Sequence, residues 1–354
     1  MKLCFFGFYR HDYSRNRILL RGLRAQGVEV IECHTTARGV MKYIDLIRKH
    51  YAVRDAYDVL FVAYPGYMPA LLARMLTRKP IVYDAFFSIY DSVVNDRQTV
   101  RVGSVAGWYY WWIDRLACMA ADVVLLDTNA NIEYFVRTFK IPRSKFSRLL
   151  IGSDESAIFP EPTDRTGPFR VHFHGGYNPM QGAEYIVEAA SRLRDEPVVF
   201  QMVGRGQMFR EVEALARQLD LRNIEFTPKV AYEELRAYMN RADICLGIFA
   251  DTLKADRVIP NKAYEAISVS KVLVTRDSTA MRELFVDRKH CVFVKAADPD
   301  DLAQKIRMLF RDQVMRDQIA HEGYALFQNH LTTACIGGDL KDIVQELLKK
   351  HHVV

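Results

Sequence analysis

Cysteine is scarce in this chain of 354 residues, and its placement excludes folds that depend on disulfides or structural zinc. The six cysteines stand singly, most of them inside apolar runs such as CFF, ICLGI and CVFV. Buried, reduced thiols of this kind are typical of a cytosolic protein, so we expect a cytoplasmic location. The ten histidines are also scattered, and no pair has the spacing of a metal site, so we predict no bound metal.

Long apolar runs and a strong charge of one sign are missing too. No uninterrupted run reaches the ~20 apolar residues that a membrane-spanning helix needs, and the run at the N-terminus is too short for a signal peptide. The net charge of +6 is mild. It favours anionic ligands or a membrane surface and does not predict a nucleic-acid partner. We find neither a P-loop nor a nucleophile elbow.

The sequence does contain a regular alternation of short apolar runs and longer amphipathic segments. Runs such as DVLFVAY and ADVVLLD are typical of strands in a parallel sheet that is covered on both faces. Segments such as SRNRILLRGLRAQG and NANIEYFVRTF are typical of the helices between them, and Asp127 or Thr128 could cap the second one. We therefore predict an α/β fold with two Rossmann-like, doubly wound parallel sheets that face each other across a cleft.

The length predicts two domains, at ~150 residues per domain. Proline and glycine accumulate in IGSDESAIFPEPTDRTGPF, residues 151–169, so we place the link between the domains there. We expect an N-terminal domain over 1–160 and a second domain over 161–330. The remaining residues, 331–354, contain the amphipathic stretch GGDLKDIVQELLKK, a helix that we expect to pack back toward the first domain.

Two glycine turns in the second half are candidates for binding a phosphorylated ligand. The first, FHGGYNPMQG, contains Gly175 and Gly176, and the second, VGRGQM, contains Gly204 and Arg205. Backbone without side chains can approach a ligand closely, and the amide groups at a helix start attract anions without any cationic side chain. Either turn alone could equally be a tight strand-to-helix connection that needs glycine only for its geometry.

A third candidate stretch is FADTLKADRVIPNKAYEAISVSK, residues 249–271. Glu265 is a carboxylate among apolar residues on a predicted helix, and a carboxylate can accept both vicinal hydroxyls of a ribose. Lys254, Arg257 and Lys262 could supply the positive charge that the glycine turn lacks. The alternatives are a solvated helix glutamate and three exposed surface cations.

Polar residues also follow the strands of the first half. Asp84 ends the predicted strand in VYDAFFSIYD and Asp91 follows soon after, so either carboxylate could face the cleft, although Asp84 could instead cap a turn. Tyr9, Arg10 and Arg15 follow the first strand. We assign Tyr9, Arg10, Arg15 and Asp91 to acceptor binding, with a plain polar loop as the alternative.

An aromatic stretch in the first half carries Trp108, Trp111 and Trp112 close together. Their helical spacing favours a stripe that packs into the core. Aromatic residues flanked by arginines also suit a bilayer interface or a lipid-linked acceptor. The flanking arginines are Arg97, Arg101 and Arg115.

These features together resemble the retaining glycosyltransferases of family GT4, the glycosyl transferases group 1, which have the GT-B fold. The order and spacing of four motifs in the second half carry the resemblance, and the first half matches more loosely. The four motifs are HGGYNPMQGAEYIVEAA, VGRGQMFREVEALA, IEFTPKVAYEELRAYMNRADICLGIF and IPNKAYEAISVSKVLVTRDSTAMRELF.

Several family positions can be carried over to this sequence residue by residue. Glu265 matches the second glutamate of the family's Glu-x7-Glu motif, which implies ribose binding, while the first glutamate would fall at Arg257. The basic residues that contact the diphosphate in relatives would fall at Gly176 and Gln181, and Asp84 stands where many members have a histidine.

Other positions agree with the family pattern. Some members have a Pro-Asn-Lys-x-x-Glu version of the glutamate helix, which Pro260, Asn261 and Lys262 fit. Lys229 and Val230 match the turn that contacts the nucleotide base.

The resemblance implies transfer of a sugar, with retention, from a UDP- or GDP-sugar to a glycan or lipid-linked acceptor. Such an enzyme would work in surface polysaccharide or glycolipid synthesis at the inner face of the membrane. The implied catalytic set is Asp84, Lys254, Arg257 and Glu265, with no metal and no further cofactor. The departures at Gly176, Gln181 and Arg257 leave two alternatives open: an inactive nucleotide- or glycan-binding relative, and a sugar-nucleotide epimerase of the same fold.

Overall fold

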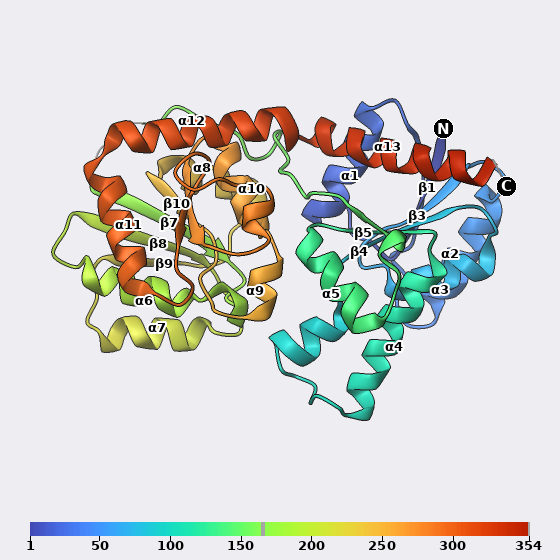
Figure 1. The fold of residues 1–354 in the computed structure, drawn as a ribbon, viewed down its shortest axis with the longest axis horizontal. Coiled ribbons are helices and arrows are strands. Elements are labelled where there is room, and N and C mark those ends of the chain that lie inside the picture. The colour runs from blue at the N-terminus through green and yellow to red at the C-terminus, as the bar shows by residue number, and fades with distance from the viewer. Residues whose placement is uncertain (164–166, 353–354) are drawn as a thin grey trace. The chain divides into compact units, whose positions relative to one another are not determined.

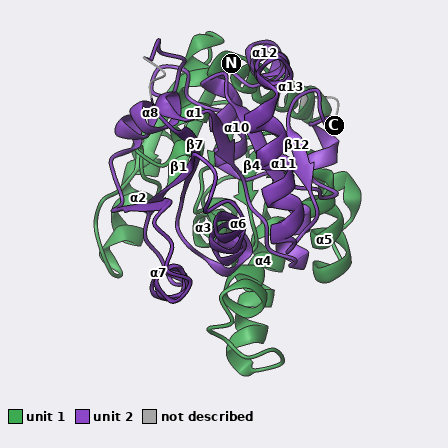
Figure 2. Ribbon diagram, turned by 90° about the vertical axis from the view of Figure 1, so that its left-hand side faces the viewer, with its two compact units in different colours: residues 1–151, 333–354 green, residues 152–332 purple. Residues whose placement is uncertain are grey.

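The computed structural model describes residues 1–163 and 167–352, which form two compact units (Figure 1; Figure 2). Unit 1 comprises Met1–Ile151 and Thr333–Val354, and unit 2 comprises Gly152–Thr332. The chain therefore passes from unit 1 to unit 2 at residue 151, nine residues before the expected boundary at 160. The segment predicted to link the domains includes residues 164–166, which lie outside the described residues.

Unit 1 is built on a parallel sheet of six strands in the order β2-β1-β3-β4-β5-β6. The strands are β1 (Lys2–Gly7), β2 (Glu29–His34), β3 (Val59–Val62), β4 (Ile81–Phe86), β5 (Val123–Leu126) and β6 (Phe146–Arg148). Every residue of β3 and β4 is buried, which is why these strands are continuous apolar runs in the sequence. The α-helices of this unit are α1 (Ser14–Ala25), α2 (Met41–Val53), α3 (Tyr67–Leu76), α4 (Val105–Ala120), α5 (Asn129–Phe139) and α13 (Thr333–His352). Shorter turns of helix are η1 (Asp91–Asp96) and η2 (Arg143–Lys145).

Unit 2 repeats the plan with a second parallel sheet of six strands, in the order β12-β11-β10-β7-β8-β9. The strands are β7 (Phe169–Gly175), β8 (Val198–Gly204), β9 (Ile224–Thr227), β10 (Ile244–Leu246), β11 (Val272–Arg276) and β12 (Val292–Val294). The α-helices are α6 (Ala183–Arg192), α7 (Phe209–Gln218), α8 (Tyr232–Arg241), α9 (Leu253–Arg257), α10 (Asn261–Ser268), α11 (Pro299–Arg311) and α12 (Gln313–His330). Single turns of 3-10 helix are η3 (Pro179–Gln181) and η4 (Met281–Glu283). The prediction of two doubly wound parallel sheets is confirmed.

The helix ends follow from local side-chain chemistry. Thr128 caps α5, because its hydroxyl accepts a hydrogen bond from the backbone N–H of Asn131 at 3.0 Å. Ser104 caps α4 in the same way through the N–H of Gly107. Each cap satisfies an amide group that the first turn of a helix leaves without an intrahelical partner.

The C-terminal helix of unit 1 is longer than expected and packs on α1. It begins at Thr333 rather than at Gly337, and Gly337 lies inside the helix, against Gly22 of α1. A Cβ atom on Gly337 would lie 2.1 Å from the carbonyl carbon of Gly22, and one on Gly22 would lie 2.4 Å from the carbonyl oxygen of Thr333. Glycine at both positions therefore allows the two helix backbones to touch.

Candidate functional site

The two predicted glycine turns of unit 2 lie against each other. Strands β7 and β8 pair in register, so that Gly175 stands opposite Gly204. Gly204 has a φ of +124°, and a Cβ atom there would lie 2.1 Å from the carbonyl oxygen of Gly175. A Cβ atom on Gly206 would lie 1.5 Å from the carbonyl oxygen of Gly176. Glycine is therefore needed at these positions so that the two turns can meet.

Gln181 stabilises the first glycine turn through hydrogen bonds of its side chain and its backbone. Its side-chain oxygen accepts the backbone N–H of Tyr177 at 3.2 Å, and its backbone oxygen accepts the N–H of Phe249 at 3.0 Å. Gly176 is different, because the space where its Cβ would stand is open to a distance of 4 Å. Gly176 thus marks the point where a ligand could approach the backbone of the turn. The Arg205 side chain is exposed and lies over the ring of Phe209, 4.8 Å from its centroid.

A buried chain of polar side chains ends at Glu265. Nδ1 of His172 is 2.9 Å from Oε1 of Gln201 and its Nε2 is 3.0 Å from Nδ1 of His174. Nε2 of His174 is in turn 2.8 Å from Oε2 of Glu265. The four residues are buried and come from three elements, β7, β8 and α10. We call Gln201, His172, His174 and Glu265 the relay.

The inner histidine of the relay is neutral. Burial, with a further contribution from His174, lowers the pKa of His172 well below its ordinary value, so this ring is neutral. His172 links Gln201 to His174 through its two ring nitrogens. Nε2 of His174 then contacts the Glu265 carboxylate at the end of the relay.

Lys262 lies near the relay on the first turn of α10. It is buried, and its Nζ lies 3.8 Å from the centroid of the Phe173 ring with no hydrogen-bond partner among the described residues. Burial lowers the pKa of Lys262 to about 7, and the Glu265 carboxylate only partly opposes this fall. A buried ammonium group without a hydrogen bond is costly to maintain, which is the condition that a bound anion would relieve.

The other predicted residues of unit 2 are more exposed. Lys254 and Arg257 lie half-buried on the short helix α9, and Asn261 is half-buried at the start of α10. Lys229 is exposed and Val230 half-buried after β9. The structure thus brings Glu265, Lys262 and the glycine turns into one region of unit 2, since His174 directly precedes Gly175. The outer residues Arg205 and Lys229 are at its surface.

Asp84 and Arg15 of unit 1 form a fully buried ion pair. Arg15 binds the carboxylate through Nη2 at 2.8 Å and Nε at 3.0 Å, and neither side chain is exposed. Arg15 also donates through Nη1 to the backbone oxygens of Leu149 at 3.1 Å and Leu150 at 3.0 Å. In this placement the two side chains contact the protein rather than a ligand, and the catalytic and acceptor roles suggested for them stay predictions.

The remaining acceptor-side candidates lie apart in unit 1. The Tyr9 hydroxyl is buried and donates to Oε2 of Glu32 at 2.8 Å. Arg10 is exposed and bonds to Asp12. Asp91 is buried at the start of η1, where it accepts a hydrogen bond from Asn95 at 2.8 Å. Their acceptor role is not tested by this geometry.

Two of the three tryptophans of the aromatic helix α4 are exposed instead of forming a stripe in the core. Trp108 is 56% and Trp112 is 48% exposed, whereas Trp111 packs inward and donates from its indole nitrogen to the oxygen of Thr138 at 3.1 Å. The face toward the core carries smaller side chains instead, including Ala117. The stripe prediction is therefore wrong for Trp108 and Trp112. The exposed apolar residues on and just before α4, which we call the α4 face, are Val102, Val105, Trp108, Tyr109, Trp112, Leu116 and Met119.

A groove of about 230 Å³ adjoins the α4 face and is lined by aromatic and glycine residues that include Tyr90 and Trp111. Of the arginines expected beside it, Arg97 and Arg101 are exposed. Arg115 instead donates to the oxygen of Lys140 at 3.0 Å, which satisfies a carbonyl at the end of α5. None of the helices in the described ranges 1–163 and 167–352 is long and apolar enough to cross a bilayer.

Sequence reasoning did not find the relay residues His172, His174 and Gln201. A signal was present, because two histidines alternate along the strand FRVHFH directly before the glycine turn. Alternate residues of a strand share one face, so the pattern placed two polar rings together in an otherwise apolar strand. Their partner on α10 is 91 residues away and could not be read from spacing.

The two doubly wound units define the class of the protein, the GT-B fold of glycosyltransferases. HepE of Anabaena, solved in complex with UDP and glucose, matches 98% of this chain and 100% of its own, with a TM-score of 0.76 and 14% identity. Sucrose-phosphate synthase of Thermosynechococcus elongatus matches 99% of this chain and 100% of its own, also at a TM-score of 0.76 and 14% identity. At such low identity these likenesses show the fold alone.

The likeness to a family lies in the sequence of unit 2. Residues 168–312 match the family model of the glycosyl transferases group 1, which confirms the resemblance to GT4 over that range. WcaI of Escherichia coli K12, which is named for a glycosyl transferase role in colanic acid biosynthesis, is 37% identical over 99 residues. That match covers 28% of this chain and spans only 24% of the length of WcaI.

Proposed function

We propose that this protein is a glycosyltransferase that moves a sugar from a nucleotide diphosphate sugar to a glycan or lipid-linked acceptor. One observation carries the proposal: the relay holds Glu265 on α10 directly beside the paired glycine turns of unit 2. A fixed carboxylate next to exposed turn backbone suits a ribose diol attached to a diphosphate. The family match of unit 2 and the likeness to a structure that holds UDP and glucose support the same ligand class.

In this proposal Glu265 accepts hydrogen bonds from both ribose hydroxyls. His174 keeps the carboxylate in position, because its Nε2 is hydrogen-bonded to Oε2 of Glu265. The backbone beside Lys229 and Val230 contacts the base, which is uracil or guanine.

The diphosphate binds to the turn at Gly176 and to the ammonium group of Lys262. Negative charge grows on the diphosphate as the bond to the sugar breaks, and a cation fixed before the reaction stabilises that charge without reorganising. Lys254 and Arg257 of the adjoining helix α9 add further positive charge for the diphosphate. The sugar is transferred with retention, the leaving phosphate takes the proton of the acceptor hydroxyl, and this step needs no metal.

The acceptor is proposed to bind unit 1 through Tyr9, Arg10 and Asp91. The α4 face suits a lipid surface, since exposed indole rings beside the exposed Arg97 and Arg101 fit the boundary of an anionic bilayer. The enzyme would then add sugars to a surface polysaccharide or a glycolipid at the inner face of a membrane.

Two observations favour a second candidate function, a nucleotide- or glycan-binding protein without turnover. Asp84, the residue expected near the donor sugar, is buried and bonded to Arg15. The glycine turn also presents Gly176 and Gln181 where relatives carry cations. Such a protein would bind the donor through Glu265 and leave it intact.

Incubation of the purified chain with a panel of UDP- and GDP-sugars tests the proposal. We expect one donor class to raise the melting temperature and to be hydrolysed slowly without an acceptor. Glu265→Gln should strongly reduce both effects, whereas Glu211→Gln, an exposed glutamate of α7, should retain them. Protection without hydrolysis would favour the second candidate, and no response to any donor would refute both.

A further inference from the structure

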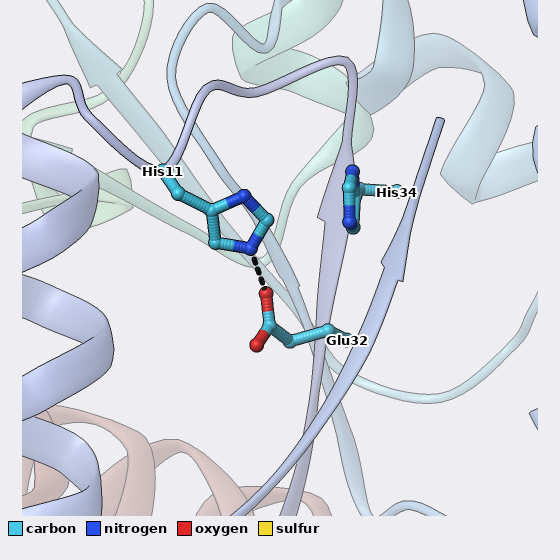
Figure 3. A group of neighbouring side chains, drawn as sticks. All are labelled: His11, Glu32 and His34. Carbon is cyan, nitrogen blue, oxygen red and sulfur yellow. Dashed lines mark hydrogen bonds and ion pairs between the residues drawn. The ribbon is translucent and has the colours of Figure 1, made fainter. Parts of the chain in front are cut away.

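We propose that His11, Glu32 and His34 of unit 1 form a binding site for one divalent transition metal ion, with zinc as the best fit. Figure 3 shows the three side chains pointing toward one another. They lie outside the unit 2 residues proposed to bind the donor, and the proposal does not depend on the transfer reaction.

Backbone pairing brings the three side chains together. Glu32 and His34 alternate on β2, so both project from the same face of that strand. His11 comes from the loop after β1, which is the parallel neighbour of β2. One ligand atom from each residue lies within 4.8 Å of the other two. Two ligands of one zinc ion stand about 3.3 Å apart, given Zn–N distances of ~2.0–2.1 Å, so small side-chain rotations complete the site.

The two histidines offer ring nitrogens to such an ion. His11 contacts Oε2 of Glu32 through Nε2, and the ion would take the place of the proton between these atoms. The His34 ring stands 4.6 Å from the His11 ring at 81°, and its Nδ1 is buried without a hydrogen-bond partner in the described parts of the chain. Most buried polar atoms in folded proteins have a hydrogen-bond partner, and a bound metal ion would give this nitrogen one.

Neighbouring side chains hold Glu32 in place, as outer residues do around metal ligands. Tyr9 donates to Oε2 of Glu32 at 2.8 Å, and Arg24 donates to Oε1 at 2.6 Å. Because Arg24 occupies Oε1, Glu32 offers the ion a single oxygen, Oε2. The set is then two imidazole nitrogens and one carboxylate oxygen, a combination that zinc accepts with a fourth position open.

The location suits an exchangeable ligand in that fourth position. His34 is the last residue of β2, and His11 follows the end of β1, so the site lies at the carboxyl edge of the sheet, where open α/β sheets bind ligands. The His11 side chain is half exposed, which gives an ion a path from solvent. Water or an oxygen atom of a ligand would complete the coordination.

Metal titration of the full chain tests the proposal. After treatment with a chelator and dialysis, the wild type should retain one equivalent of added Zn²⁺, measured by elemental analysis, and should melt at a higher temperature with zinc than without. Co²⁺ in place of zinc should give the visible absorption of a four-coordinate site. His11→Ala and His34→Ala should each remove the bound equivalent and the Co²⁺ spectrum.

Three further variants separate a metal site from an ion-pair cluster. Tyr9→Phe should keep the stoichiometry and weaken Zn²⁺ binding by about 10-fold, since it removes one outer hydrogen bond from Glu32. His321→Ala, an exposed histidine of α12, should bind zinc like the wild type. If the His11→Ala/His34→Ala double variant folds, as judged by circular dichroism, and retains as much zinc as the wild type, the residues form an ion-pair cluster only and the proposal is overturned.

Discussion

The two units are both built on a six-stranded parallel sheet, but they differ in strand order and in how their buried charges are paired. In unit 1, Arg15 donates hydrogen bonds to Asp84 and to two backbone oxygens, so both charged groups of the pair have partners within the protein. In unit 2, Glu265 is held by His174, and Lys262 on the same helix has no hydrogen-bond partner in the described ranges. Removing one partner of a buried charge pair destabilises the fold, whereas a buried charge without a hydrogen-bond partner would gain stability from a bound counter-ion.

We therefore expect substitutions at the buried charges of the two units to have different effects on stability and on ligand affinity. Changes to the buried pair of unit 1 should lower stability whether or not a ligand is present. Changes to the relay or to Lys262 should lower ligand affinity more than stability. The following variants test that difference.

Asp84→Ala should have the largest effect on stability. It leaves the Arg15 guanidinium buried without its carboxylate, which costs about 3–5 kcal/mol for a buried pair broken on one side. Thermal and urea unfolding measure the loss. Glu225→Ala is the matched control, because it breaks the exposed pair with Arg170 and should cost less than about 1 kcal/mol. Lost turnover at an unchanged melting temperature would show instead that Asp84 is catalytic.

His174→Ala should lower the affinity for UDP-glucose, used here as the probe donor, with a smaller effect on folding. It removes a hydrogen bond to a charged group, worth about 1.5–3 kcal/mol, or roughly 10- to 100-fold in affinity. Calorimetric titration measures the change, with His321→Ala as the control.

A double variant shows whether His174 acts through Glu265. If it does, His174→Ala combined with Glu265→Gln should lose no more affinity than Glu265→Gln alone. Additive losses would mean that His174 contacts the donor itself or supports the fold.

The sequence was sufficient to predict those features that depend on neighbouring residues. Buried parallel strands are continuous apolar runs, so β3 and β4 could be recognised directly. The cap of α5 by Thr128 lies within three residues of its partner. Glu265 was noticed because a carboxylate is unusual among the apolar residues of α10.

The features that were missed depend on contacts between distant residues. Arg15 and Asp84 are 69 positions apart, and His174 and Glu265 are 91 apart, so no local pattern could pair them. The candidate metal ligands could not be predicted for the same reason. His11 comes close to His34 only because β1 pairs with β2. Helical periodicity located the stripe of Trp108 and Trp112, but it does not say whether a stripe faces the core or solvent.

Lys262 should make donor binding depend on pH. The pKa of Lys262 is about 7 in the folded protein and 10.5 for an ordinary lysine, so the free protein loses this charge as the pH rises through 7. We expect the affinity for UDP-glucose, whose diphosphate does not titrate near neutrality, to fall by about 10-fold between pH 6.5 and 8.5, or about 1.4 kcal/mol. Binding at pH 8 should also take up a proton, measured by calorimetry in buffers of different ionisation enthalpy.

The same shift makes a separate prediction for stability. Between pH 7 and 10.5 the unfolded chain holds a proton on Lys262 that the folded chain lacks. The contribution of Lys262 to the free energy of unfolding therefore rises with pH across this window. Lys262→Met should flatten both profiles, and a pH dependence of binding that survives in Lys262→Met would contradict the assignment.

The smallest effect on stability is expected at the α4 face of unit 1, where the comparison with unit 2 concerns apolar surface rather than charge. In the described residues of unit 2, the large apolar side chains that are exposed, such as Leu253 and Val314, stand singly, whereas those on α4 form one continuous face.

Trp108→Ser/Trp112→Ser should change the free energy of unfolding by less than about 0.5 kcal/mol per site, because substitutions at exposed positions disturb little packing. If the face binds lipid, the same variant should sediment less with vesicles of anionic phospholipid, while Val314→Ser should sediment like the wild type. Loss of stability without loss of vesicle binding would mean that the two indole rings support the fold of unit 1 and do not contact a membrane.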